Sequence, residues 1–386
     1  MNGPSTGSER TNKALSLKKD SRRYLNMPNN YMQRALTLAQ KALGGVSPNP
    51  AVGAVIVKNG EIVGEGYTQP PGSAHAEIVA LQQASEAARG ATMYVTLEPC
   101  CHHGRTPPCT DAIIASGITA VNMAILDPNP IVSGNGKAAL EANGITTRVG
   151  ENEEEAQEMV EAYSKFITSK KPFVTAKFAM SLDGKIATKK YDSKWISNDW
   201  SRRYVHQVRS ESDAVMVGVN TVLRDDPQLT ARLGEDVPQP LRIIVDSRGQ
   251  TSPTANALQQ SGRTLIATTT AIEMSRANEY TNAGVEVVSL KSEGGQVDLV
   301  ELMKVLGRKE ITSILVEGGG SLLGSLFDLG LVDKVIAFVA PMIIGGKEAV
   351  TPVGGQGVDV VTQAFRLNRI KTEQFGDDIM ISGYIG

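Results

Sequence analysis

The chain has 386 residues, which is too long for one ordinary single-core domain and predicts two domains, each with its own core. Its 39 Lys and Arg residues nearly balance 41 Asp and Glu residues, giving a net charge of −2. This balance argues against nucleic acid as the main partner and favours a small molecule. No apolar run is long enough to cross a bilayer, and the first residues lack the apolar core of a secretory signal. We therefore expect a soluble cytoplasmic protein that contacts no membrane.

The first residues differ in charge from the rest of the chain. Residues 1–34 contain seven Lys or Arg and two Asp or Glu, so they carry +5. Residues 1–28 are predicted to be a disordered basic extension, because they have too little apolar surface to offset the entropy lost on ordering. An organelle transit peptide is the alternative, and it is weakened by Glu9, Asp20 and the lack of a clear amphipathic helix.

A helix over residues 31–45 is followed by two strands joined at Asn59-Gly60, a strong hairpin signal. Strands and helices then alternate as far as residue 150. The pattern predicts helices over 75–90 and 109–117 and strands over 91–97 and 120–126. This alternation predicts a largely parallel sheet covered by helices on both faces, with ligands bound at the carboxyl ends of the strands.

Residues 151–171 are charged and are predicted to form a linker helix that ends before Pro172. Beyond the linker the alternation begins again and predicts a second α/β domain over 172–386. Its expected strands cover 173–180, 213–219, 241–246, 264–270, 285–290, 311–320 and 334–344.

Three of the four histidines and all three cysteines lie within residues 73–79 and 96–110. His75 opens a predicted helix, Cys100 follows a strand, and Cys109 opens another helix. Imidazole and thiolate are the usual zinc ligands, and a catalytic zinc keeps three of them with its fourth position open. These three residues therefore predict one zinc ion per chain.

Glu77, two residues after His75, is placed to act as the general acid and base. The order His-x-Glu, then Pro-Cys and a second Cys, matches the zinc nucleobase deaminase signature, in which zinc-activated hydroxide displaces an exocyclic amine as ammonia. Here eight residues separate Cys100 from Cys109 where the signature has two. Cys101 is interpreted as a bystander. His102 and His103 belong either to the substrate loop or, if one of them is a fourth ligand, to a purely structural zinc site.

Several longer motifs extend this pattern over both halves of the chain. They are SPNPAVGAVIVKNGEIVGEGY, HAEIVAL, YVTLEPCCHHGRTPPC, DPNP, KFAMSLDGKIAT, SKWIS, TVLRDDPQLTAR and VEGGGSLLGSLF. From about Tyr31 to the C-terminus the chain resembles the bifunctional riboflavin-biosynthesis deaminase–reductases. The resemblance implies an N-terminal cytidine-deaminase-like α/β/α domain over 29–150 and a C-terminal dihydrofolate-reductase-like α/β domain over 172–386.

For the first domain the resemblance implies deamination of 2,5-diamino-6-ribosylamino-4(3H)-pyrimidinone 5′-phosphate. It places Asn49, Arg105, Asp127 and Asn129 at substrate-binding positions. On sequence alone, Asn49-Pro50 and Asp127-Pro128 are equally well explained as turns. The family often has His where this chain has Thr68, so a second base near the substrate is expected to be missing.

For the second domain the resemblance implies NADPH-dependent reduction of the ribosyl group to ribityl, which yields 5-amino-6-ribitylamino-uracil 5′-phosphate. The implied cofactor positions are Ala179, Trp195, Thr221, Asp225, Ser247, Gly319, Gly320, Ser321 and Leu322. The implied substrate positions are Ser193, Arg209, Leu229, Arg232 and Glu317.

These reductase positions have simpler interpretations too. Residues 317–326 form a glycine-rich turn that suits phosphate binding, although a packing turn has the same composition. Arg209 and Arg232 suit a 5′-phosphate, although two surface arginines look the same in sequence. Trp195 is equally compatible with core packing, and Asp225 with a turn. Lys177 and Asp183 are candidates for positioning the sugar.

The resemblance also implies a homo-oligomer whose partners are small-molecule pyrimidine ribosyl phosphates. A deaminase acting on nucleic acid is disfavoured, because such an enzyme needs a basic channel or stacking aromatics and only 5% of this chain is aromatic.

Overall fold

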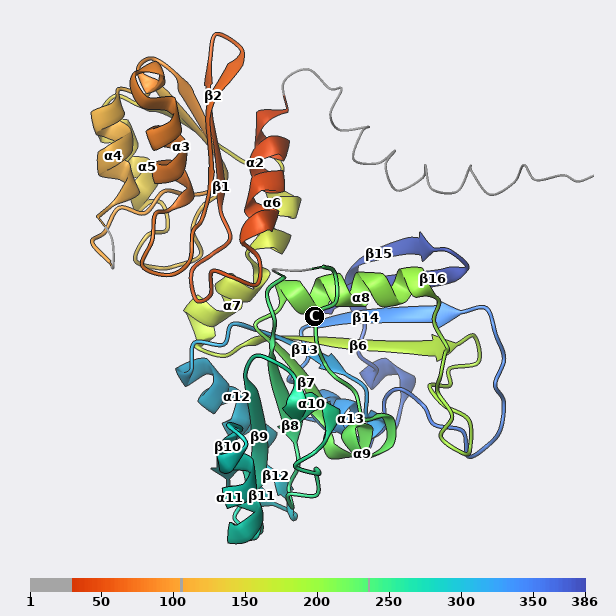
Figure 1. Ribbon diagram of the computed structural model, residues 1–386. Helices are drawn as coiled ribbons and strands as arrows, with labels where there is room; N and C mark the ends of the chain where they lie inside the picture. The colour runs from red at the N-terminus through yellow and green to blue at the C-terminus, as the bar shows by residue number, and fades with distance from the viewer. Residues whose placement is uncertain (1–29, 105–106, 235–236) are drawn as a thin grey trace, which may run out of the picture.

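The computed structural model describes residues 30–104, 107–234 and 237–386, which form two α/β parts joined by short helices (Figure 1). The predicted basic extension 1–28 and Arg105 lie outside the described residues. No helix in the described part of the chain is long and apolar enough to cross a membrane.

The first part contains a five-stranded sheet in the order β2-β1-β3-β4-β5. Its strands are β1 (Gly53–Lys58), β2 (Glu61–Tyr67), β3 (Thr92–Leu97), β4 (Ala120–Ile125) and β5 (Thr146–Val149). Only β3, β4 and β5 are parallel, because the β1–β2 hairpin adds two antiparallel pairings. Asn59 and Gly60 have φ of 53° and 83°, the left-handed values that a tight hairpin turn requires. The sheet is therefore mixed, and the expectation of a largely parallel sheet is wrong for the first part of the molecule.

Helices cover this sheet and place the residues of the predicted metal site. They are α2 (Tyr31–Ala39), α3 (Ala76–Ala84), α4 (Cys109–Ser116) and α5 (Asn135–Ala142). The helix α3 packs directly on β2 at Gly64 and Gly66, where an added Cβ would lie 2.3 Å from the Ala80 carbonyl oxygen and 2.2 Å from that of Ala76. Glycine at these two positions lets the backbone of α3 approach the sheet, and this fixes the helix that begins after His75.

The expected linker helix is two short helices, α6 (Glu153–Met159) and α7 (Glu161–Ser169), separated at Val160. Both pack against the first part of the molecule, since Ala156, Val160 and Tyr163 belong to its hydrophobic core.

The second part contains a nine-stranded sheet in the order β10-β9-β8-β7-β13-β6-β14-β16-β15. Its strands are β6 (Phe173–Ser181), β7 (Ala214–Gly218), β8 (Leu241–Val245), β9 (Thr264–Thr269), β10 (Glu286–Leu290), β13 (Ser313–Glu317), β14 (Lys334–Ala340), β15 (Leu367–Phe375) and β16 (Asp378–Ile385). The first seven pair in parallel, and β16 and β15 add antiparallel strands at one edge. The two-residue strands β11 (Ser292–Glu293) and β12 (Gln296–Val297) form a separate hairpin.

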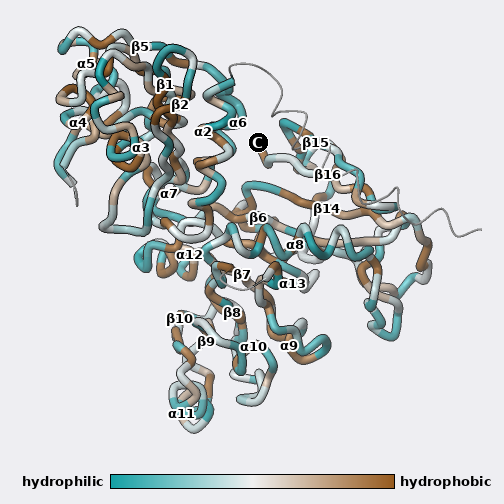
Figure 2. The backbone as a smooth tube through the Cα atoms, turned by 45° about the horizontal axis from the view of Figure 1, so that its top comes forward, coloured by the Kyte–Doolittle hydropathy of each residue, from teal (hydrophilic) through white to brown (hydrophobic). Residues whose placement is uncertain are grey.

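Hydrophobic cores lie on both faces of this sheet. On β7, Ala214 and Met216 belong to one core, and Val215 and Val217 to the other, because alternate side chains of a strand point to opposite faces. The covering helices are α8 (Asp199–Glu211), α9 (Val219–Asp225), α10 (Asn256–Gln259), α11 (Met274–Asn282), α12 (Leu299–Arg308) and α13 (Gly320–Asp328). Figure 2 shows hydrophobic stretches along the central strands of both parts.

The two parts contact each other next to the loop that carries Asn49. An added Cβ at Gly44 would lie 1.8 Å from the Ser210 carbonyl oxygen of α8, so the two backbones touch there. The Ser47 hydroxyl is 3.1 Å from that of Thr312, which precedes β13. Ion pairs between the linker helices and the second sheet add to this contact, among them Lys334 with Glu161 at 2.9 Å.

Candidate functional site

The structure brings His75, Cys100 and Cys109 together at the predicted metal site. Their ligand atoms all lie within 4.8 Å of one another. His75 Nδ1 is 3.6 Å from Cys100 Sγ and 3.3 Å from Cys109 Sγ. His75 is the N-cap of α3, Cys100 follows β3, and Cys109 is the first residue of α4. One nitrogen and two sulfur donors at these separations form a set that fits zinc.

The electrostatics of the site favour the thiolate of Cys100. Hydrogen bonds with Cys109 and His75 lower the pKa of Cys100 to about 4. The backbone N–H of Cys109 also donates to Cys100 Sγ at 3.3 Å. The contact with Cys100, together with burial, raises the pKa of Cys109. One thiolate therefore forms readily at neutral pH, and thiolate is the form of cysteine that binds metal.

Glu77 lies in the first turn of α3 and is only 4% exposed. Burial, together with the nearby charge of Cys100, raises its pKa to about 7. A carboxyl group with a pKa near neutrality can both accept and donate a proton, which is the property that a general acid and base needs. Glu77 and His75 line the same cavity, which has a volume of about 340 Å³.

Other residues predicted to bind substrate line the same cavity. Asn49, Asp127 and Asn129 are all in its wall. Asp127 accepts hydrogen bonds from the Tyr163 hydroxyl at 3.0 Å and from the backbone N–H of Asn129 at 2.8 Å. Burial raises the pKa of Asp127 to about 6. The carboxyl of Asp127 is thus held by its own loop and by helix α7.

Glu98 holds that loop against the metal site, a role that sequence reasoning missed. Its carboxylate accepts backbone hydrogen bonds from Asp127 at 3.1 Å, Gly134 at 2.9 Å and Lys137 at 2.8 Å. Because Glu98 is two residues before Cys100, it connects the cysteine loop to the loop of Asp127. Its place in the Glu-Pro-Cys motif was the only signal in the sequence.

Thr68 has a structural contact in the cavity wall. Its side chain is buried, and its Oγ accepts a hydrogen bond from the backbone N–H of Val52 at 3.1 Å. His102 also lines the cavity, and its buried Nδ1 has no hydrogen-bond partner among the described residues. Cys101 is not part of the group formed by His75, Cys100 and Cys109. His103 is exposed.

A second and larger cavity, of about 1050 Å³, lies in the second part of the molecule. Most of the positions implied for the cofactor line it, together with one implied for the substrate. They are Thr221, Asp225, Ser247, Gly319, Gly320, Ser321, Leu322 and Ser193. Ala179 on β6 and Trp195, which is 67% exposed, are not in its wall.

The glycine-rich turn forms part of this second cavity. Gly318 and Gly319 have φ of 73° and 82°, which residues with a side chain rarely adopt, and α13 begins at Gly320. An added Cβ at Gly320 would lie 2.8 Å from the Thr351 carbonyl oxygen. The first residues of α13, Gly320, Ser321 and Leu322, line the cavity, and a helix N-terminus is an arrangement that suits phosphate.

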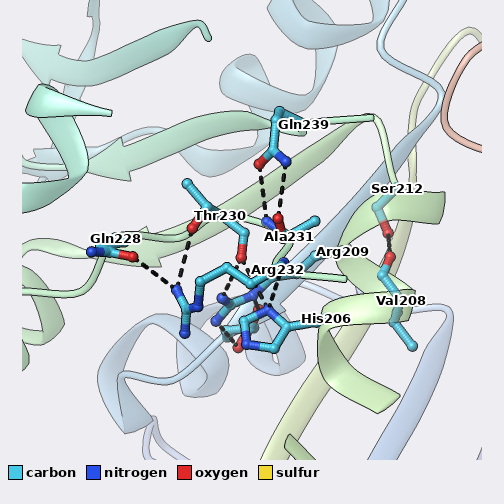
Figure 3. Close-up of polar contacts among 10 residues, drawn as sticks. His206, Val208, Arg209, Ser212, Gln228, Thr230, Ala231, Arg232 and Gln239 are labelled. Carbon is cyan, nitrogen blue, oxygen red and sulfur yellow. Dashed lines mark hydrogen bonds and ion pairs between the residues drawn. The ribbon is translucent and has the colours of Figure 1, made fainter. Parts of the chain in front are cut away.

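Arg209 and Glu317 form a buried, bidentate ion pair. Arg209 Nε is 2.5 Å from Glu317 Oε1, and Nη2 is 2.9 Å from Oε2. Their side chains are 12% and 11% exposed. Arg209 Nη1 also donates to the Thr230 carbonyl at 3.0 Å. Arg232 is more exposed, and its Nη1 donates to Gln228 at 3.1 Å and to the Thr230 hydroxyl at 3.2 Å (Figure 3). Of the two arginines, Arg232 is therefore the freer to bind a phosphate.

His206 lies next to these arginines and was missed in the sequence (Figure 3). Its Nδ1 is 3.1 Å from the Thr230 carbonyl oxygen and 3.3 Å from the backbone nitrogen of Arg232. Burial and the charges of Arg209 and Arg232 lower its pKa to about 4. His206 and Arg209 are three residues apart on α8 and so lie on the same side of the helix; this spacing was the signal that could have found His206.

Lys177 on β6 lies opposite Glu317 on β13 in the parallel register. Burial lowers the pKa of Lys177, and the charge of Glu317 acts against this effect.

Two other residues singled out in the sequence have structural features of their own. Leu229 is buried, with a left-handed φ of 57°. Asp183 accepts hydrogen bonds from the backbone N–H groups of Ile344 and Gly345, and so holds a loop in place.

The fold and these two cavities define a protein with a zinc-binding deaminase part followed by a reductase part. Residues 26–125 match the model of the cytidine and deoxycytidylate deaminase zinc-binding region, and residues 172–381 match that of the RibD C-terminal domain. The chain belongs to the RibD family of riboflavin biosynthesis proteins, which confirms both the resemblance and the expected pair of folds.

Relatives and solved structures match over nearly the whole chain. The riboflavin biosynthesis proteins RibD of Actinobacillus pleuropneumoniae and Aquifex aeolicus are 44% and 45% identical to it; each covers 91% of this chain, and the matches span 93% and 97% of those proteins. A structure of Acinetobacter baumannii RibD is 35% identical, with a TM-score of 0.81, and covers 92% of this chain and 98% of its own.

A Thermotoga maritima structure described as a diaminohydroxyphosphoribosylaminopyrimidine deaminase/5-amino-6-(5-phosphoribosylamino)uracil reductase is 36% identical, with a TM-score of 0.79. It covers 92% of this chain and 97% of its own.

Proposed function

We propose that the first part deaminates 2,5-diamino-6-ribosylamino-4(3H)-pyrimidinone 5′-phosphate and that the second part then uses NADPH to reduce the ribosyl group. The final product is 5-amino-6-ribitylamino-uracil 5′-phosphate. One observation carries this proposal: the group of His75, Cys100 and Cys109 lies at a cavity lined by His75, Cys100 and the buried Glu77, in a chain whose other half matches the RibD C-terminal domain.

The proposed domains follow the helices that join the two parts. A deaminase domain covers 29–150, a linker 151–171 and a reductase domain 172–386, preceded by a basic extension over 1–28. We further propose a cytoplasmic enzyme that forms a homo-oligomer. The support for these points is the family relationship and, for the linker, the position of α6 and α7 between the two sheets.

In the deaminase domain, His75, Cys100 and Cys109 would hold one zinc ion. Zinc bound there supplies a water nucleophile at neutral pH, because it lowers the pKa of water from about 15.7 to about 7. Glu77 accepts the proton of that water, passes it to the ring nitrogen and later protonates the departing amine. One water is consumed and one ammonia is released, while the ring carbon exchanges its amine for an oxygen.

The other residues of the cavity orient the pyrimidine ribosyl phosphate. Asn49 binds the ring, and Asp127 and Asn129 bind the ribosyl group, with Arg105 as a further substrate contact. Tyr163 and Glu98 keep the loop of Asp127 in place through the hydrogen bonds described above. Fixed polar groups of this kind raise the rate by holding the reacting atoms in a reactive geometry.

In the reductase domain, the large cavity binds NADPH through the residues in its wall and through Ala179 and Trp195. NADPH supplies the hydride when it is bound. Ser193, Arg209, Leu229, Arg232 and Glu317 form the sugar phosphate site. Lys177, held beside Glu317, positions the sugar carbon that accepts the hydride, and Arg232 contacts the phosphate.

Ammonia release by zinc-loaded protein without NADPH tests the first step. The wild-type protein is expected to release ammonia from the diaminopyrimidinone, and Glu77→Gln is expected to lose at least about 100-fold in rate, because general acid–base groups contribute at least that much. Zinc content is measured in both proteins. Equal ammonia release by the two proteins would show that Glu77 does not move the proton.

A further inference from the structure

Helix α7 and the residue after it form one wall of the deaminase cavity. Tyr163, Phe166, Ile167 and Lys170 are spaced i, i+3, i+4 and i+7, which places them on one face of the helix. All four line the cavity that contains His75. A stripe from the segment between the two sheets therefore contacts the space in which the substrate of the first domain would bind.

This stripe has a defined direction along the cavity. At one end the Tyr163 hydroxyl donates to both carboxylate oxygens of Asp127, at 3.0 and 3.3 Å. At the other end is Lys170, seven residues later and so about 10 Å further along the helix axis. If Asp127 binds the ribosyl group, a phosphate on that group extends along the stripe towards Lys170.

The charges of the cavity wall make this lysine important for an anionic ligand. Four carboxyl groups are in the wall, those of Glu77, Glu98, Asp127 and Glu310. Within the described part of the chain, Lys170 is the only Lys or Arg that lines this cavity. A phosphate monoester carries a charge of about −1.5 to −2 at neutral pH, so it needs a cation to enter a site lined by carboxylates.

Lys170 is held in place by both parts of the molecule. It has a left-handed φ of 57°, and its N–H donates to the Phe166 carbonyl at 2.8 Å. An added Cβ at Gly307 of α12 would lie 2.0 Å from the Lys170 carbonyl oxygen, so the reductase domain touches its backbone directly. The ammonium is 5.4 Å from the centre of the Phe166 ring. The side chain is exposed, which leaves its charge accessible to a ligand.

We propose that Lys170 binds the 5′-phosphate of the deaminase substrate and makes the first domain selective for phosphorylated over unphosphorylated pyrimidine ribosides. This inference rests on the deaminase function proposed above. Its consequence is that a residue whose backbone packs against the reductase domain sets the substrate specificity of the deaminase. The reductase domain therefore contributes to the deaminase site through this contact.

The test compares ammonia release from the ribosylamino 5′-phosphate and from the same riboside without phosphate, with wild type, Lys170→Gln and Lys171→Gln. Lys171 is the matched control, because it is the adjacent lysine, is only partly exposed and does not line the cavity. Lys170→Gln is expected to lose about 10- to 100-fold in kcat/KM on the phosphorylated substrate, mostly through KM, since a hydrogen bond to a charged group has about that effect.

Activity of Lys170→Gln on the unphosphorylated riboside should equal that of wild type, and Lys170→Arg should restore most of the loss. Ribose 5-phosphate should inhibit wild type and Lys171→Gln more strongly than Lys170→Gln. The proposal is overturned if Lys170→Gln keeps the wild-type preference for phosphate, or if it loses activity equally on both compounds. If wild type deaminates neither compound, the deaminase function itself has failed, and the proposal fails with it.

Discussion

The two cavities of this protein are built in different ways. In the deaminase part, the three candidate metal ligands and Glu77 all come from the short stretch between His75 and Cys109, carried by two helix N-termini and the loop after one strand. The reductase residues are spread from Lys177 to Leu322 and meet only because β6, β13 and β7 are neighbours in the sheet. A local motif can therefore specify one site, whereas the other depends on the topology of the whole domain.

The two sites also differ in how charge is stabilised. At the deaminase site the ligand atoms of His75, Cys100 and Cys109 lie close enough together to bind one cation. In the reductase domain Arg209 and Glu317 neutralise each other in a buried ion pair. Removing a residue from the first site should remove chemistry, and removing one from the second should also remove stability.

The largest effect is expected from the metal ligands. Cys109→Ser should reduce zinc content from about one ion per chain to a small fraction of that and abolish ammonia release, because it removes one of only three protein ligands. NADPH-dependent reduction of the deaminated intermediate should continue. Cys101→Ser is the control and should keep both zinc and activity. Equal zinc loss in the two variants would contradict the assignment of ligands.

Breaking the buried ion pair should destabilise the reductase domain. Glu317→Gln leaves the Arg209 guanidinium buried without its carboxylate, a change that typically costs about 3–5 kcal/mol. The expected result is a lower urea midpoint for the transition followed by reductase activity, with ammonia release retained at low urea. Glu279→Gln removes the exposed partner of Arg276 and should change stability by less than about 1 kcal/mol. A comparable fall in both variants would show that the buried pair has no special role.

Replacing Thr68 should have a smaller effect on stability. Thr68→Val leaves the buried N–H of Val52 without its side-chain acceptor and should cost about 1–3 kcal/mol. Thr68→Ser retains the hydroxyl and should restore stability. Both variants should show the wild-type dependence of ammonia release on pH, measured where each is folded. A change in that dependence would instead show that Thr68 takes part in proton transfer.

The smallest effect concerns His206 and pH. Its pKa is about 4 in the folded protein and about 6.5 when unfolded, so the unfolded state binds more protons between these values. Stability should therefore fall as the pH drops from about 6.5 towards 4. His206→Asn should reduce the Tm difference between pH 7 and pH 5 by about 2 °C or less, since His206 is half-buried and partly screened.

His103→Asn, which replaces an exposed histidine, is the control for this experiment and should leave the Tm difference unchanged. The comparison with wild type removes the effect of acid on the metal site. A Tm difference that His206→Asn leaves intact would contradict the electrostatic account.

Much of the fold could be predicted from local patterns. The hairpin at Asn59-Gly60 is found because both residues suit a turn with positive φ, and the strands β1 and β2 lie on either side of it as expected. The strands β15 and β16 were missed, since β15 is exposed along most of its length and so lacks a clear apolar alternation. The mixed first sheet was missed because strand direction depends on pairing across the sheet.

In the candidate sites, too, features set by local sequence could be predicted and those that depend on tertiary packing could not. The grouping of His75, Cys100 and Cys109 could be predicted, because each lies next to the end of a helix or strand and their order matches a known signature, although the spacing of the two cysteines is longer. Their roles stay predictions. The contribution of Lys170 to the deaminase cavity could not be found in the sequence, because it depends on how α7 packs between the two sheets. The surroundings of His206 likewise depend on tertiary structure, because its partners Thr230 and Arg232 lie in a loop that packs on α8.

The most direct test of the account measures the two half-reactions separately in two variants. Glu77→Gln should release no ammonia from the diaminopyrimidinone but should reduce the supplied deaminated intermediate at the wild-type rate with NADPH. Lys177→Gln should release ammonia normally and fail to reduce that intermediate. Two distinct sites on one chain predict this result, in which each variant loses one half-reaction and keeps the other. Loss of both half-reactions in Glu77→Gln, with zinc still bound and the protein folded, would contradict it.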